Sequence, residues 1–123
     1  MTVLVAVPDS PEGIAALAAA AAEAQLLGVG LVAVNLALTP LDTSSVPAST
    51  KVTVVERHGK PDRDPVDAVL ADIEEYGAQR LVIGVRRRTP VGKAILGSVS
   101  QRLLLEAPIP VLAVKLDGST DRS

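Results

Sequence analysis

Short apolar runs alternate with longer helix-forming segments along this chain. Five runs rich in Val, Leu and Ile are near-continuous rather than alternating: Val3 to Val7, Val29 to Leu38, Val52 to Val55, Leu81 to Gly84 and Val111 to Val114. Runs of this kind are typical of strands that helices cover on both faces. The pattern therefore predicts an α/β fold with a buried parallel sheet.

Three segments between these runs carry helix start signals. Ser10, Asp64 and Ser98 each offer a side-chain oxygen to the free N–H groups of a following first turn. Gly28 and Gly77 are expected to end the first two helices in a left-handed conformation. With right-handed crossovers, this order of elements predicts a doubly wound sheet with helices on both faces.

A single domain over residues 1–115 accommodates all of these elements. The stretch 39–50, with two prolines and several Ser and Thr residues, has no helical periodicity and is expected to be a surface loop. Residues 116–123 are polar and are expected to form a flexible tail.

Composition excludes several classes of function. The 123 residues carry a formal charge of −2, one aromatic side chain and no cysteine, so no disulfide, thiolate nucleophile or cysteine-bound metal is available. Neither the global positive charge nor the stacking aromatics of a nucleic-acid-binding protein are present. No apolar stretch has the length or character of a membrane span or a signal peptide core. We expect a cytoplasmic protein without a nucleic-acid or membrane partner.

The most informative segment runs from Gly84, where the fourth strand is expected to end, to Ser98. In doubly wound folds, a loop between a strand and the next helix holds ligands, because free N–H groups and the positive end of the helix dipole converge there. Arg86, Arg87, Arg88 and Lys93 add positive charge. The segment predicts an anion site, most naturally for phosphate; the alternative is a solvated arginine run beside an ordinary helix start.

This segment resembles the signature Gly-x2-Gly-x9-Gly-[Ser/Thr] of the universal stress protein (UspA-like) family. Gly84, Gly97 and Ser98 match in register, and Val99 and Ser100 follow. The opening Val3 to Val7 with Ser10-Pro-Glu, and the closing run 107–115, fit the family as well, so the similarity spans nearly the whole chain. It implies a sheet of order 3-2-1-4-5, of the adenine nucleotide alpha hydrolase type, with ATP or AMP bound at this loop.

The resemblance also assigns ligand roles to residues outside the signature. Pro8 stands where the family commonly has an Asp that contacts the nucleotide, with Asp9 displaced by one, and Leu36 is expected to lie against adenine. Arg87 replaces the second signature glycine and could bind phosphate through its guanidinium, with Arg86 beside it. Mg²⁺ is expected only if ATP is bound. This short member therefore departs from the ATP-binding motif at Pro8 and Arg87.

The family resemblance further implies a homodimer through the last strand, Val111, Leu112, Ala113 and Val114, whose apolar edge would otherwise stay unpaired. Family members usually carry another helix where this chain has residues 39–50, so we expect that face of the sheet to be thinly covered. Two hypotheses stay open: a nucleotide-binding stress-response protein, or a dimeric interaction module of the same fold that has lost the ligand.

No residues suggest a metal site or strong catalysis. His58 is the single histidine and lies in a polar stretch, and Asp62, Asp64 and Asp67 gather near a helix start that stabilises negative charge anyway. Glu12 and Glu23 are interpreted as ordinary helix surface. A phosphate-receiving domain with Asp9 as an acid would need a phosphoacceptor Asp after the third strand, where Glu56 stands instead. We therefore expect a protein that is not an enzyme, with weak ATP hydrolysis at most.

Overall fold

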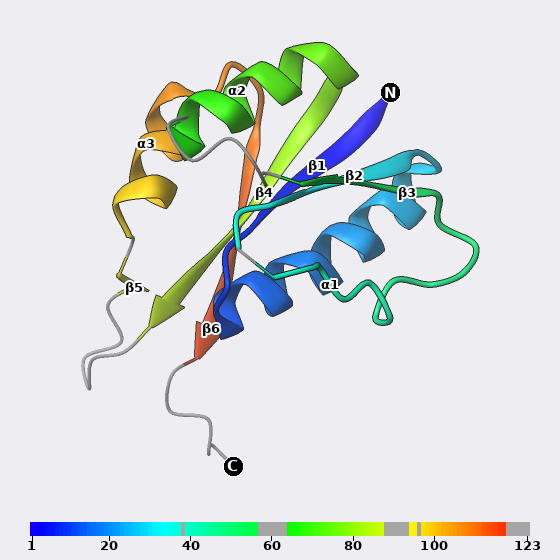
Figure 1. Cartoon of the computed structure of the whole chain (residues 1–123), viewed down its shortest axis with the longest axis horizontal. Helices are drawn as coiled ribbons and strands as arrows, with labels where there is room; N and C mark the ends of the chain where they lie inside the picture. Colours follow the sequence, from blue (N-terminus) through cyan, green and yellow to red (C-terminus); the bar gives the residue numbers. More distant parts are fainter. Residues whose placement is uncertain (38, 57–63, 88–93, 96, 118–123) are drawn as a thin grey trace.

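The computed structural model describes residues 1–37, 39–56, 64–87, 94–95 and 97–117 (Figure 1). In chain order the elements are β1 (Thr2–Val7), α1 (Pro11–Leu27), β2 (Gly30–Asn35), β3 (Val52–Glu56), α2 (Pro65–Tyr76), β4 (Ala78–Arg87), β5 (Ala94–Ile95), α3 (Ser98–Glu106) and β6 (Val111–Asp117). His58, Asp62, Arg88 and Lys93 lie outside the described residues.

The sheet has the predicted topology. Five strands run parallel in the spatial order β3, β2, β1, β4, β6, which is the order 3-2-1-4-5 when the long strands are numbered along the chain. An additional two-residue strand, β5, pairs antiparallel with Arg86 and Arg87 of β4 and was not predicted. From β1 the chain first adds β2 and β3 on one side of it and then β4 and β6 on the other side. Doubly wound folds hold ligands at the point where the strand order reverses, which is here between β1 and β4.

Helices cover both faces of the sheet, as predicted. Leu4 and Ala6 of β1 point into a core shared with α2 and α3, whereas Val3, Val5 and Val7 point into a core shared with α1. Figure 1 shows α2 and α3 on one side of the sheet and α1 on the other. Because both faces are buried, β1 and β2 are apolar almost throughout.

The connection between β2 and β3 contributes to the core on the α1 side. Leu41 and Val46 are partly buried and pack against that cluster. Two apolar side chains of this irregular segment thus cover sheet and helix surface beside α1. No described helix stands between β2 and β3, and this irregular segment takes part in covering the face that was expected to be thinly covered.

The capping signals were correct for two helices and wrong for the third. Ser10 Oγ accepts the Gly13 N–H at 3.3 Å, Asp64 Oδ1 accepts the Val66 N–H at 2.8 Å, and Gly28 and Gly77 end their helices at φ of 70° and 60°. Ser98, in contrast, is the first helical residue of α3 and not its cap. Gly97 occupies the cap position, which leaves this helix start without a side-chain cap.

Several strand ends also differ from the sequence expectation. The second strand stops at Asn35 rather than Leu38, and β4 continues past Gly84 to Arg87. The last strand extends to Asp117, so the predicted tail begins later than residue 116, and 118–123 lie outside the described residues. The extension of β4 has a clear cause: β6 pairs with it up to Arg87, and β5 pairs with its last two residues on the other side.

Candidate nucleotide site

A cavity of ≈ 420 Å³ opens at the carboxyl ends of the strands, between β1 and β4 and the starts of α2 and α3. Seven of the ten residues predicted as ligand contacts line it: Pro8, Leu36, Gly84, Gly97, Ser98, Val99 and Ser100. These residues come from four separate parts of the chain. The tertiary structure therefore gathers most of the predicted site at one place.

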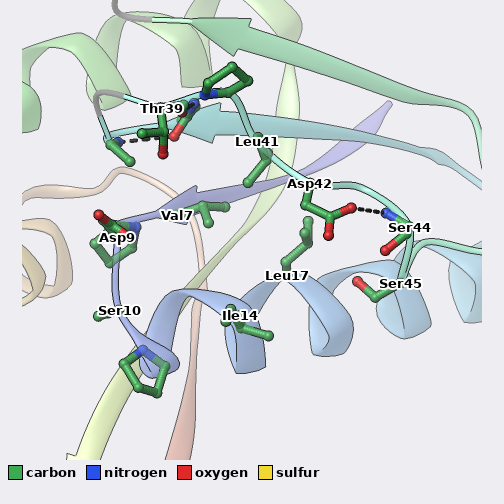
Figure 2. A pocket seen from close by; sticks show the side chains of 15 residues that line it. Val7, Asp9, Ser10, Ile14, Leu17, Thr39, Leu41, Asp42, Ser44 and Ser45 are labelled. Atoms are coloured by element: carbon green, nitrogen blue, oxygen red, sulfur yellow. Dashed lines mark hydrogen bonds between the residues drawn. The ribbon is translucent and has the colours of Figure 1, made fainter.

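The remaining three predicted residues are placed differently. Asp9 lines a second cavity on the α1 side of the sheet rather than the first one (Figure 2). The backbones of Arg86 and Arg87 belong to β4, so these residues do not lie in a loop that starts at Gly84, as the sequence had suggested. Their side chains are outside the described part of the structure.

The backbone of α1 approaches β4 so closely at Gly84 that the position requires a glycine. A Cβ placed on it would stand 2.3 Å from the carbonyl oxygen of Glu12, which is well inside van der Waals contact. The start of α1 thus rests directly on β4. The sequence attributed this glycine to ligand binding, whereas the structure gives it a packing role that needs no ligand.

Gly97 has the opposite environment. Its backbone is extended, with φ −69° and ψ 168°, and a Cβ there would meet no described atom within 4 Å. The glycine lines the cavity, and among the described atoms nothing stands where a side chain of this residue would begin. No side chain of the described residues caps the first turn of α3, whose N–H groups and dipole favour an anion.

The cavity wall is divided into an apolar and a polar part. Ile83, Val85 and Leu103 are buried apolar residues of β4 and α3, and Leu36 joins them because its N–H donates to the Val7 carbonyl at 3.0 Å. Ser98 and Ser100 provide hydroxyls, and Ser100 Oγ lies 3.5 Å from the Gly84 carbonyl oxygen. A flat heterocycle attached to an anionic group matches this division.

Seven lining residues are not among the predicted ligand contacts: Ala6, Ser10, Glu12, Pro65, Ile83, Val85 and Leu103. Two of these seven belong to helix starts. Pro65 begins α2 at the edge of the cavity, and Glu12, interpreted as helix surface, lines it beside Gly84. The only signal for either was its position next to a helix cap, which says nothing about where that cap lies in space. Glu23, which was also interpreted as ordinary helix surface, has a side chain that is 23% exposed and forms an ion pair with Arg80 at 3.0 Å.

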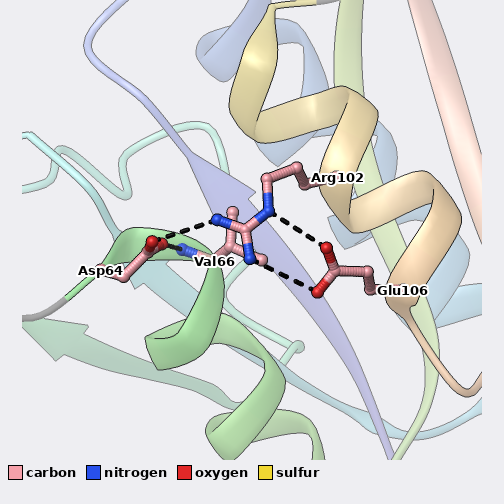
Figure 3. Close-up of polar contacts among 4 residues, drawn as sticks. All are labelled: Asp64, Val66, Arg102 and Glu106. Carbon is pink, nitrogen blue, oxygen red and sulfur yellow. Dashed lines mark hydrogen bonds and ion pairs between the residues drawn. The ribbon is translucent and has the colours of Figure 1, made fainter.

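An ion-pair network beside the cavity connects the start of α2 to α3 (Figure 3). Arg102 Nη1 donates to Asp64 Oδ2 at 3.1 Å, and its Nε donates to Glu106 Oε2 at the same distance. The Val66 N–H, above all, lowers the pKa of Asp64, and Arg102 lowers it further. Asp64 precedes Pro65, so the network joins α2 to α3 next to the cavity.

Charged groups near the cavity do not form a metal site within the part of the chain that the structure describes. No group of three or more His, Asp or Glu side chains there is placed to hold a metal ion.

Among the helices that the structure describes, none is long and apolar enough to cross a membrane.

Comparison with known proteins decides the family. A sequence model of the universal stress protein family matches residues 41–115, which include β3, α2, β4, β5, α3 and most of β6. The chain belongs to the universal stress protein family. The segment from Gly84 to Ser98 lies within the matched residues.

Individual relatives agree with this assignment. A universal stress protein of Mycolicibacterium smegmatis is 56% identical over 55 residues, which span 45% of this chain and 42% of that protein's length. The structure of a universal stress protein from Archaeoglobus fulgidus is 28% identical, covers 94% of this chain and 98% of its own, and has a TM-score of 0.69. A universal stress protein from the same organism, solved in complex with dAMP, is 25% identical with a TM-score of 0.65 and covers 94% and 98% of the two chains.

Proposed function

We propose that this universal stress protein binds an adenine nucleotide, ATP or AMP, in the cavity between β1 and β4. The observation that carries the proposal is the uncapped start of α3 at Gly97 beside an apolar wall that includes Leu36. The dAMP complex of the Archaeoglobus fulgidus relative supports the ligand class. A stress-response role follows from the family rather than from any feature of the cavity.

Each part of the nucleotide has a matching part of the wall. The adenine ring packs against Leu36 and the neighbouring aliphatic side chains, since no aromatic residue lines the cavity. The phosphate accepts hydrogen bonds from the first N–H groups of α3 and from the Ser98 and Ser100 hydroxyls. Arg86 and Arg87 supply positive charge from the end of β4. If ATP is the ligand, Mg²⁺ accompanies it and offsets the charge of the phosphates.

Calorimetry with ATP and AMP, with and without Mg²⁺, tests the proposal. Gly97→Ala should weaken binding roughly tenfold or more, equivalent to about 1.4 kcal/mol, because its methyl group enters the space of the phosphate. Gly30→Ala is the matched control: its Cβ would be 3.5 Å from the Lys51 carbonyl oxygen, an ordinary contact far from the cavity. Equal affinities of the two variants, or no saturable binding at millimolar nucleotide, would refute the proposal.

The role given to Arg87 has a separate test. Arg87→Ala should reduce the affinity for ATP more than that for AMP, because a charge-assisted contact to phosphate is lost and ATP carries more negative charge. Unchanged affinity for both nucleotides would remove this side chain from the site. The rest of the proposal would then depend on the α3 start alone.

We further propose that the protein acts as a homodimer through β6. Among the described strands β6 pairs only with β4, which leaves its other edge open, and Leu112 on it is 40% exposed. Light scattering should give a dimer mass for the natural chain and a monomer mass for Leu112→Lys. Leu26→Lys on α1, where Leu26 is 80% exposed, is the control and should stay dimeric. A dimer mass for Leu112→Lys would contradict the edge-pairing interface.

The second hypothesis, a dimeric interaction module without a ligand, is supported by the same open edge of β6. It predicts a dimer together with no nucleotide binding. In both cases we propose a cytoplasmic protein without strong catalysis. A phosphate-release assay with Mg²⁺ and ATP should show turnover that is slow at most, and rapid multiple turnover would contradict this part of the proposal.

A further inference from the structure

Another cavity, which at ≈ 550 Å³ is larger than the proposed nucleotide site, lies on the α1 side of the sheet. Its walls are the first turns of α1, the ends of β1 and β2, and the segment from Ala37 to Ser45. Pro8 and Ser10 line both cavities, so the link between β1 and α1 separates them. This second cavity, called here the α1 cavity, is distinct from the proposed nucleotide site.

The floor of the α1 cavity is aliphatic. Val7 and Leu17 are buried there, and Leu41 is partly buried against the same core. Ile14 is 67% exposed although it lines the cavity, which is unusual for a side chain of this size. Figure 2 shows these side chains grouped between α1 and the segment that carries Leu41. A hydrocarbon chain in the cavity would cover Ile14.

The wall formed by the irregular segment is held in place by hydrogen bonds. Asn35 at the end of β2 is 1% exposed, and its Nδ2 donates to the Thr39 carbonyl oxygen and to Glu56 Oε1, both at 2.8 Å. Its Oδ1 accepts the Ala37 N–H at 3.0 Å. The cavity therefore has a preformed wall, which lowers the entropy cost of binding a ligand.

Two carboxylates mark the ends of the aliphatic floor. In Figure 2, Asp9 and Asp42 lie on opposite sides of the cavity, with Val7, Leu17 and Leu41 between them. Among the described residues that line the cavity there is no Lys or Arg. The Asp42 carboxylate is oriented by the Ser44 N–H, which donates to Oδ1 at 2.9 Å and lowers the pKa of Asp42. Asp42 is thus ionised at neutral pH.

We propose that the α1 cavity binds a short aliphatic diamine, with one ammonium group at Asp9, the other at Asp42, and the carbon chain on the aliphatic floor. An anion would be repelled by both carboxylates. A neutral alkane would leave both carboxylates without a counter-charge beside it. A monoamine would pair with one carboxylate only, so its affinity should be lower than that of a diamine of equal length.

An amide NMR titration with the four-carbon diamine putrescine tests the proposal without any nucleotide. Saturable shifts are expected at residues 7–14 and 39–45, around the α1 cavity. Butylamine should bind more weakly, and the dianion succinate should cause no saturable shifts there. Because no nucleotide is added, failure of this experiment leaves the proposed function untouched, and failure of nucleotide binding leaves this proposal untouched.

Single variants separate a built site from general attraction to an acidic protein. Asp9→Asn and Asp42→Asn should each weaken putrescine binding roughly two- to fivefold, as expected for solvent-exposed ion pairs. Glu75→Gln on α2, an exposed site on the opposite face, removes the same charge and should leave the affinity unchanged. Equal affinities of all three variants and the natural chain, shifts at other residues, or no saturation would overturn the proposal.

Discussion

The contact between Gly84 and the start of α1 gives the sharpest prediction. A Cβ at Gly84 would stand 2.3 Å from the Glu12 carbonyl oxygen and 2.9 Å from its carbonyl carbon. A carbon and an oxygen in contact keep about 3.3 Å apart, so Gly84→Ala must move α1 away from β4 by about 1 Å. The obstacle is backbone and not the end of a flexible side chain, so no change of rotamer relieves it.

The size of the effect follows from the packing around this contact. The shift would disturb α1, whose buried alanines pack against the sheet. Overpacking in such a core costs about 2 kcal/mol. For a chain of this length, 1 kcal/mol corresponds to about 4 °C in Tm, so Gly84→Ala should melt about 8 °C below the natural protein.

Thermal unfolding followed by circular dichroism is the assay, and Gly30→Ala is the control. Both glycines lie in strands, but the Cβ at Gly30 would meet its nearest atom at 3.5 Å, so this variant should match or exceed the stability of the natural chain. A Gly84→Ala protein that melts together with Gly30→Ala would show that α1 does not rest on β4 as described.

Three further predictions concern the helices. Asp64→Ala should lower Tm at neutral pH. Because the folded pKa of Asp64 lies below its unfolded value of 3.8, the difference in Tm between this variant and the natural chain should shrink as the pH falls below 3.8. Melting curves across this pH range test the prediction, and a difference in Tm that does not change with pH would contradict it. Leu103→Ala should lower the free energy of unfolding, measured in urea, by about 2–5 kcal/mol, since Leu103 is 1% exposed. A decrease below about 1 kcal/mol would mean that α3 is not packed in the core. Gly77→Ala should lower the free energy of unfolding by about 1–2 kcal/mol because Gly77 has a φ of 60°, and Gly77→Asn should lower it less. Equal Tm values of both variants and the natural chain would rule out the left-handed cap.

Where helices begin and end was largely readable from local chemistry. A capping oxygen or a left-handed glycine acts within one turn, so Ser10, Asp64, Gly28 and Gly77 were identified from their neighbours alone. The prediction that Ser98 caps α3 was wrong. A serine before a helical segment is typical of a cap, but the cap position of α3 is one residue earlier, at Gly97.

The composition of the site was only partly readable. The family resemblance predicted Leu36, Gly97 and Ser98 as ligand contacts. These residues line one cavity because the carboxyl ends of parallel strands meet at one edge of the sheet. Asp9 faces the other cavity, and a one-residue offset along an irregular link is enough to turn a side chain to the opposite side. Glu12 and Pro65 line the site through the placement of whole helices, which no local pattern specifies.

The alternation of buried strands and capped helices could be predicted from the amino-acid sequence, and the resemblance to the universal stress protein family pointed to the family that the comparisons then showed. Hydrophobic periodicity and capping are local, so they can be evaluated along the chain. Three features became visible only in the folded chain: Gly84 supports α1, no described atom stands within 4 Å of a Cβ at Gly97, and Asp9 and Asp42 flank a second cavity. These properties depend on distances between residues that are remote in the chain, and such distances exist only after the elements have packed.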